Sequence, residues 1–251
     1  MLNQFSRTEL LFGSEAITRL QNAHVAVFGI GGVGGYTVEA LARSGVGSFD
    51  LIDNDTVALT NLNRQIIATL DTVGQPKVEV MAKRIASINP DANVNCRQCF
   101  FLPANQHEFD FSQYDYVVDA VDTVAAKIAI VLAAKAAGVP VISSMGAGNK
   151  VNPAMFEVAD IYKTKVDPLA RVMRQAMKKN NIKKLKVVYS QELPLLPINE
   201  EIESECHAET SKRRALPGSN AFTPSVAGLI IASEVIKDLV GWDDSHRKGL
   251  A

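Results

Sequence analysis

The chain has 251 residues, of which 47% are hydrophobic and 21% charged, and its formal net charge is −1. These fractions are typical of a soluble globular protein and exclude a disordered, collagen-like or disulfide-stapled chain. Three cysteines, an odd number, favour a reducing compartment over a secreted disulfide framework. Residues 1–20 lack the uninterrupted apolar core of a signal peptide, so we expect a cytoplasmic protein.

The first 150 residues alternate short apolar runs with segments of helical periodicity. The expected order is strand 24–29, helix 34–43, strand 48–53, a helix opening at Pro76, strand 93–99, strand 116–119, helix 124–137 and strand 139–143. This alternation predicts an α/β fold with a Rossmann-like, mostly parallel sheet and helices on both faces. Ligands of such sheets bind at the carboxyl ends of the strands.

The last hundred residues lose this alternation. Strands are expected at 156–161 and 186–190, helices at 167–180 and 224–239, and a long loop at 192–220. No linker interrupts the chain, so we expect a single domain, residues 1–251. It would consist of a nucleotide-binding core (1–150) and a C-terminal α+β extension (151–251) that serves substrate binding or dimerisation.

The most apolar late stretch, residues 226–240, contains Glu234 and Lys237. It is also shorter than the ~20 apolar residues that a membrane span requires. We therefore expect a buried helix and no stable membrane span. Docking of this amphipathic helix on a membrane surface stays open.

Four glycines and an acid predict an adenine-nucleotide site. Gly29, Gly31, Gly32 and Gly34 follow a strand and open a helix, where backbone N–H groups and the positive helix end favour a phosphate. Asp53 ends the next strand, where a carboxylate accepts hydrogen bonds from ribose hydroxyls. A dehydrogenase would show the same pair, so these residues do not identify the nucleotide.

Charged residues beyond this pair favour a nucleoside triphosphate. Arg64 and Lys77 have no use in nicotinamide chemistry, whereas they can neutralise phosphoryl oxygens as pyrophosphate leaves. Asp119 and Asp122 follow a later strand and are carboxylates of the type that hold Mg²⁺ together with substrate phosphates. All these residues fall on one predicted edge of the sheet.

The sequence at this point resembles the E1-like activating superfamily, which includes the adenylating enzymes for molybdopterin and thiamin sulfur carriers. The matching motifs are the GxGGxG loop, the acid after the second strand, N-x-N-R-Q (61–65), Q-P-K (75–77) and the aspartates before the alanine-rich helix. Within the superfamily, the chain is most similar to the tRNA threonylcarbamoyladenosine dehydratases, through residues 5–7, 143–148, 160–168 and 219–228.

The resemblance implies ATP and Mg²⁺ as cofactors. The implied ATP-binding residues are Gly29, Gly31, Gly32, Gly34, Asp53, Asp55, Asn61, Arg64, Lys77 and Asp119, with Arg7 in a similar phosphate-binding role. Arg64, Lys77 and Asp122 are the implied catalytic residues, and Asp122 is the implied Mg²⁺ ligand. Since the arginine at position 64 often reaches into the partner subunit in this superfamily, a homodimer is also implied. Thr123 replaces the usual asparagine and leaves the metal carboxylate in place.

The implied reaction is ATP-dependent dehydration of N6-threonylcarbamoyladenosine in tRNA. A carboxyl adenylate forms, and ring closure then releases AMP. The implied partners are tRNA, gripped by its anticodon arm, a second copy of the chain, and a sulfur-transfer or redox protein. Nine basic residues against one acid between residues 163 and 186 fit the tRNA contact, although a solvated helix face would show the same run.

Two rival functions remain: an adenylating activator of a ubiquitin-like sulfur carrier, and an NAD-binding protein. Cys96 and Cys99 form a lone CxxC, and the second pair that a zinc site usually needs is missing, so we expect ordinary packing. The same missing pair argues against the sulfur-carrier activators. Cys206 beside His207 is a candidate acyl-accepting thiol, but the dehydration itself needs no thioester.

Overall fold

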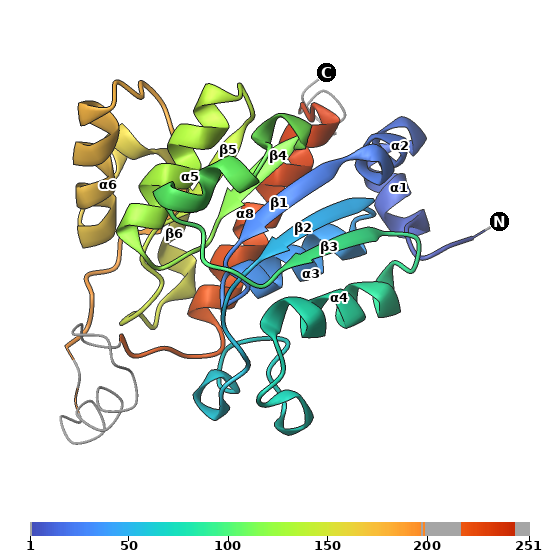
Figure 1. Cartoon of the computed structure of the whole chain (residues 1–251), viewed down its shortest axis with the longest axis horizontal. Coiled ribbons are helices and arrows are strands. Elements are labelled where there is room, and N and C mark those ends of the chain that lie inside the picture. Colours follow the sequence, from blue (N-terminus) through green and yellow to red (C-terminus); the bar gives the residue numbers. More distant parts are fainter. Residues whose placement is uncertain (1, 197, 199–216, 244–251) are drawn as a thin grey trace.

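A mostly parallel sheet organises the computed structural model, which describes residues 2–196, 198 and 217–243. These residues contain seven strands in the order β3-β2-β1-β4-β5-β7-β6 (Figure 1). The strands are β1 (His24–Phe28), β2 (Ser48–Ile52), β3 (Asn93–Arg97), β4 (Tyr116–Asp119), β5 (Val141–Ser144), β6 (Phe156–Asp160) and β7 (Lys186–Ser190). Only the β6–β7 pair is antiparallel among the described pairs. The predicted α/β class is confirmed.

Helices cover both faces of the sheet, as the sequence predicts. They are α1 (Ser6–Phe12), α2 (Ser14–Asn22), α3 (Gly34–Arg43), α4 (Lys77–Ile88), α5 (Val124–Ala136), α6 (Pro168–Lys179) and α8 (Thr223–Val240). Val25 and Val27 of β1 face the core that contains α3, α4 and α8, whereas Ala26 and Phe28 face the core that contains α5 and α6. Burial on both faces explains why β1 is apolar from Val25 to Phe28 rather than alternating.

Three features of the fold differ from the sequence-based expectation. Helices α1 and α2 precede β1, where no element was expected. Between β3 and β4 the chain forms short 3₁₀ turns that place Phe101, Phe109 and Phe111 against Phe28. Helix α4 begins at Lys77, so Pro76 lies just before it rather than in its first turn.

Helix α8 runs along one face of the sheet, from the carboxyl ends of the strands to their amino ends. Its first turn lies at the β1–α3 loop, since a Cβ on Gly32 would meet the Pro224 side chain at 3.2 Å. Its last residue accepts a hydrogen bond of 2.8 Å from Arg19 of α2 to the Val240 carbonyl. At 1.5 Å per residue, its 18 residues span about 27 Å between these two contacts.

The carboxyl ends of the parallel strands share one edge of the sheet. Phe28 pairs with Ile52 on one side and with Asp119 on the other, and Asp119 pairs with Ser143. The segments that follow β1, β2, β4 and β5 therefore leave the sheet side by side. None of the described helices is long and apolar enough to span a bilayer.

Candidate active site

The loop between β1 and α3 can form only with glycine at two of its positions. Gly29 has φ +89°, and a Cβ there would lie 2.7 Å from the Ala120 carbonyl oxygen. A Cβ on Gly34 would lie 1.8 Å from the Gly29 carbonyl oxygen. Gly31 meets nothing closer than 3.9 Å, so an incoming phosphate can approach the backbone there, at the positive end of α3.

Asp53 holds this loop from the neighbouring strand. Its Oδ2 accepts a hydrogen bond of 2.7 Å from the Ile30 N–H, and its Oδ1 accepts one of 2.8 Å from the Asp55 N–H. Burial raises the pKa of Asp53, while Lys77 and the two N–H groups oppose that shift. Because an ionised carboxylate has about four acceptor positions, Asp53 retains capacity for ribose hydroxyls.

Lys77 is held at the edge by an exposed counter-ion. Its side chain is 6% exposed, and its Nζ lies 2.9 Å from Oδ2 of Asp55, whose side chain is 51% exposed. A solvated partner attracts a lysine only weakly, by about 1 kcal/mol or less. A phosphate can therefore replace Asp55 as the partner of Lys77 without leaving a buried charge unpaired.

Arg64 lies against the glycine loop of its own chain. A Cβ on Gly32 would be 3.5 Å from Cγ of Arg64, and the guanidinium donates to the Thr60 carbonyl and to Asn63 Oδ1. Burial lowers the pKa of Arg64. Asn61 is buried and accepts the Ala58 N–H, so it shapes the turn that carries Arg64.

Gln65, which the sequence analysis did not select, also faces the loop. It is 6% exposed, its Oε1 has no hydrogen-bond partner among the described residues, and its Nε2 would be 3.9 Å from a Cβ on Gly31. A buried amide oxygen without a partner is uncommon in a folded protein. The signal was present in the N-x-N-R-Q motif, where Gln65 follows the selected arginine.

Asp119 is enclosed inside the sheet. It is fully buried, accepts a hydrogen bond of 2.5 Å from Ser143 Oγ, and lies 3.1 Å from Nζ of the fully buried Lys127. Lys127 also donates to the Val121 carbonyl at 3.0 Å. Asp119 is thus engaged with the protein, and its pair with Lys127 anchors the segment that carries Asp122. Sequence reasoning missed Lys127 because it lies in an alanine-rich helix and belongs to none of the recognised motifs.

Asp122 lies at the surface and is exposed, with Thr123 Oγ1 donating to its Oδ1 at 3.2 Å. Within the described residues no group of three His, Cys, Asp or Glu side chains could hold a metal ion. A single free carboxylate beside a phosphate site nevertheless fits Mg²⁺, which binds through one or two carboxylates, substrate phosphates and water. The donor set therefore suits a magnesium ion that arrives with ATP.

Arg7 lies away from the other predicted residues. Helix α1, which carries it, packs with α2 beside the last turn of α8, whereas the glycine loop contacts the first turn. The length of α8 therefore separates Arg7 from the glycine loop of the same chain. Its predicted phosphate-binding role cannot be met within one subunit in this arrangement.

The sequence analysis expected Cys96 and Cys99 to pack ordinarily, and they lie in β3 and just after it. Cys96 and Cys99 are free thiols, and burial raises the pKa of each. Cys96 Sγ donates to the Val78 carbonyl, in keeping with ordinary packing. Cys206 and His207 lie outside the described residues.

Comparison with known proteins adds the family. A family model described as "ThiF family" matches residues 5–250. The chain belongs to the ThiF family. A tRNA threonylcarbamoyladenosine dehydratase of Bacillus subtilis is 47% identical to this ThiF-family chain over 244 residues, which is 96% of each protein.

Two solved structures share the fold of this ThiF-family chain. Both are of the E. coli tRNA N6-threonylcarbamoyladenosine dehydratase, one in complex with AMP and one in complex with ATP. Their sequences are 33% and 34% identical to the chain, and each superimposes with a TM-score of 0.84. In each case 95% of this chain and 94% of the other are covered. These findings confirm the predicted superfamily and fold.

The buried Lys127–Asp119 pair gives a first prediction. Lys127→Met leaves the Asp119 carboxylate buried without its counter-ion, which should lower the free energy of unfolding by about 3–5 kcal/mol. Urea denaturation measures this loss. Adding Asp119→Asn removes the orphaned charge and should restore most of the stability.

Lys135→Met is the matched control, because Lys135 lies on the same helix but is exposed. It should change stability by no more than about 0.5 kcal/mol. A double variant as unstable as Lys127→Met alone would show that the charge pair is not what Lys127 contributes.

Proposed function

We propose that the chain is an ATP-dependent dehydratase of N6-threonylcarbamoyladenosine in tRNA. The carrying observation is that one sheet edge brings together the open glycine loop, Arg64, Lys77 and Asp122. A redox dinucleotide site needs the loop but not the two cations. The Bacillus subtilis relative is named a tRNA threonylcarbamoyladenosine dehydratase and aligns with 96% of this chain, which supports the proposed tRNA substrate.

The first chemical step forms a mixed anhydride. A carboxylate oxygen of the threonylcarbamoyl group attacks the α-phosphorus of ATP, and the bond to pyrophosphate breaks. Lys77 leaves Asp55 for the phosphate, and Arg64 offsets the charge that gathers on the departing oxygens. Asp122 would hold Mg²⁺, which supplies further charge neutralisation at the phosphates.

The second step closes a five-membered ring. A neighbouring atom of the carbamoyl group attacks the activated carbonyl and AMP leaves, so the substrate loses one water overall. The nucleophile belongs to the substrate, and well-oriented intramolecular attack reaches effective molarities of ~10⁵–10⁸ M. The protein therefore contributes mainly positioning and charge stabilisation.

This function predicts a specific product. Incubation of the protein with Mg–ATP and modified tRNA should give a nucleoside lighter by one water, detected by mass analysis of the digested tRNA. Arg64→Ala, Lys77→Ala and Asp122→Asn should each lower the rate about 10²–10³-fold, because each removes charge stabilisation that develops in the transition state.

Lys83→Ala provides the control, since Lys83 lies on the same helix as Lys77 but is exposed, and its Nζ donates to Gln75 Oε1. It should leave the rate unchanged. Pyrophosphate exchange stimulated by a small carrier protein instead of tRNA, or preference for NAD over Mg–ATP, would contradict the proposal and support one of the rival functions.

We further propose that the active enzyme is a homodimer in which Arg7 acts in the partner's site. Arg7 is remote from its own glycine loop, and the same helix exposes Leu10 (85%) and Leu11 (71%), as an interface helix would. Arg64 lies against the glycine loop of its own subunit, so it does not need to reach into the partner's site. The interface therefore rests on α1.

Mixing two inactive variants tests the shared site. Arg7→Ala and Lys77→Ala should each be inactive alone. After subunit exchange, half of the dimers carry one intact site, so activity should return to about a quarter of the unaltered level. Absence of recovery in mixtures that demonstrably exchange subunits would place Arg7 outside the partner's site.

The basic segment, residues 163–186, is proposed to bind the tRNA anticodon arm. Arg174 is tied to Thr164, and Lys186 to Glu234 and Asp238, so these two are engaged internally. The other seven are exposed on and around α6: Lys163, Lys165, Arg171, Lys178, Lys179, Lys183 and Lys184. Exposed cations gathered on and around one helix match the charge of a phosphate backbone. A cytoplasmic location follows from this proposed substrate.

Replacing the four lysines 178, 179, 183 and 184 with alanine should weaken tRNA binding about equally across sequences. The slope of log affinity against log salt should fall by roughly 3–4, because each lost phosphate contact removes about 0.9. Filter binding at several salt concentrations measures both. Unchanged affinity and slope would mean that the lysines are only solvated surface.

A further inference from the structure

A second buried lysine–carboxylate pair lies at the same edge, outside the predicted site. Lys150 is 3% exposed and Asp167 is 2% exposed, and Nζ of Lys150 lies 3.8 Å from Oδ2 of Asp167. The Oδ1 atom caps α6 by accepting the Ala170 N–H at 2.8 Å. The Oδ2 atom is buried and has no hydrogen-bond partner within the described residues.

This pair is incomplete as a structural element. Buried charges are normally both paired and hydrogen-bonded, and a separation of 3.8 Å is too long for a hydrogen bond. Within the described chain, this oxygen is the only recorded partner of the Lys150 ammonium. A group that donates to Oδ2 and accepts from Nζ would satisfy both atoms.

The pair lies beside the reacting edge. A Cβ on Gly146 would be 3.4 Å from Oδ2 of Asp167 and 4.0 Å from its Oδ1. Among the described residues other than Gly146 and its two chain neighbours, no further atom would lie within 4 Å of this Cβ. Ser143 of β5 and Asp119 of β4 are register partners. Gly146 lies three residues beyond Ser143, and Asp122 lies three residues beyond Asp119. Neighbouring strands lie about 4.8 Å apart, so the two segments leave the sheet together.

The backbone before Asp167 is held in an unusual conformation. Val166 has φ +61°, which is rare for a β-branched residue, and the Asp167 N–H donates to the Lys165 carbonyl at 2.6 Å. This three-residue turn stores strain of a kind that clusters at functional sites. The turn fixes the direction in which the Asp167 carboxylate points.

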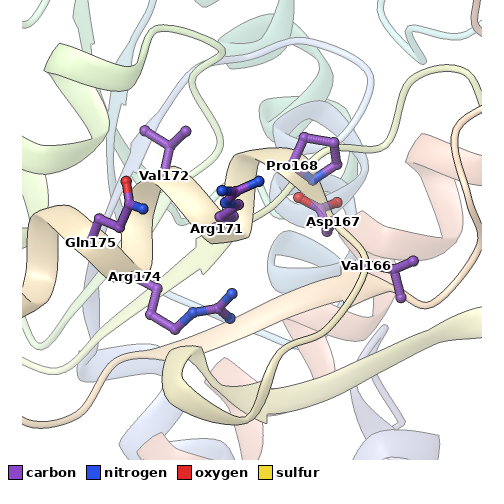
Figure 2. Close-up of a pocket in the computed structure, with 7 residues that line it drawn as sticks. All are labelled: Val166, Asp167, Pro168, Arg171, Val172, Arg174 and Gln175. Carbon is purple, nitrogen blue, oxygen red and sulfur yellow. The ribbon is translucent and has the colours of Figure 1, made fainter.

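A cavity of about 620 Å³ adjoins the turn. Figure 2 shows Val166 and Asp167 on the segment that leads into α6, and Arg171 and Arg174 on the helix itself; all four line the cavity. Thr164 fixes the Arg174 guanidinium through its hydroxyl at 2.6 Å and its carbonyl at 2.8 Å. A polynucleotide that lies along the basic surface would thus pass the buried carboxylate.

Accepting the proposed function, we propose that Lys150 and Asp167 bind the ureido group of the substrate and that Asp167 is the base for ring closure. A ureido N–H donates to Oδ2 of Asp167, and the adjacent carbonyl oxygen accepts from Nζ of Lys150. This pattern satisfies the two atoms that lack hydrogen bonds. Ring closure must release a proton from a ureido nitrogen, and the Oδ2 atom of Asp167 is a carboxylate oxygen that no donor among the described residues occupies.

The step balances as follows. One ureido atom forms a bond to the carbonyl carbon of the adenylate, and the bond from that carbon to the AMP oxygen breaks, with its electron pair leaving on AMP. The N–H proton passes to Oδ2 of Asp167, and its electron pair stays in the ring. Lys150 balances the charge of Asp167 before the proton arrives.

Asp167→Asn tests the base, because asparagine caps a helix as well as aspartate does and has nearly the same volume. In a single turnover, product formation should fall about 10²–10⁴-fold, the usual contribution of a general base. ATP–pyrophosphate exchange dependent on modified tRNA should stay near the unaltered level, since adenylation precedes the proton transfer.

Three further variants sharpen the result. Asp160→Asn is the matched control, because Asp160 also caps a turn, with its two oxygens accepting the N–H groups of Tyr162 and Leu185. It loses one of these hydrogen bonds but no proposed base, so it should not slow product formation relative to exchange. Gly146→Ala should slow product formation without slowing exchange, since the methyl group fills the approach to Oδ2. Lys150→Met should act in the same direction.

Undiminished product formation by Asp167→Asn would overturn the inference, and so would an equal fall of exchange and product formation. Equal damage from Asp160→Asn would likewise assign Asp167 to capping alone. If the unaltered chain forms no dehydrated nucleoside while its tRNA is demonstrably modified, the proposed function itself fails. The two failures are therefore distinguishable.

Discussion

The contact between the β1–α3 loop and the end of β4 constrains the rest of the site. Gly29 and Gly34 allow the chain to turn against the Ala120 carbonyl with no side chain between. This closeness aligns the start of α3 with the exit of β4, so that a phosphate on the helix end lies beside Asp122. Asp53 fixes the same loop from the other side by accepting the Ile30 N–H.

Three lysine–carboxylate pairs lie along this edge, and they differ in burial. Lys127 with Asp119 is enclosed and fully hydrogen-bonded, which suits a support. Lys77 with Asp55 has one solvated partner, so the lysine can be given up to an incoming phosphate. The third pair is enclosed but loosely joined, which leaves its polar atoms unsatisfied. The same two residue types can therefore support the fold, release a lysine to a phosphate or leave polar atoms unsatisfied. The burial and separation of each pair determine which of these it does.

The sequence predicted the parts of the fold that depend on local pattern. Strands buried on both faces give continuous apolar runs, and the glycine loop needs glycine for local steric reasons, so both were found. Helices α1 and α2 lack such a run, because they cover only the amino ends of the strands and the end of α8. The aromatic residues between β3 and β4 were missed because their packing on Phe28 is not periodic.

The site was predictable only where a residue type stands in a recognisable motif. Arg64 and Lys77 do, whereas Lys127 is one of two lysines in an otherwise apolar helix, and nothing in its surroundings in sequence indicates Asp119 as its partner. The pairing depends on the distance between α5 and β4 in space. Asp119 shows the converse, since its motif suggested an exposed ligand and its position in the sheet encloses it.

The path of α8 from one edge of the sheet to the other has a consequence for synthesis. Gly32 rests on Pro224, and Gly228 lies so close to α3 that a Cβ would be 2.3 Å from the Val33 carbonyl. The nucleotide loop therefore gains its backing only after residues 223–240 have left the ribosome. A nascent chain that has completed β1–β7 still lacks a rigid ATP cradle, so nucleotide capture depends on the synthesis of α8.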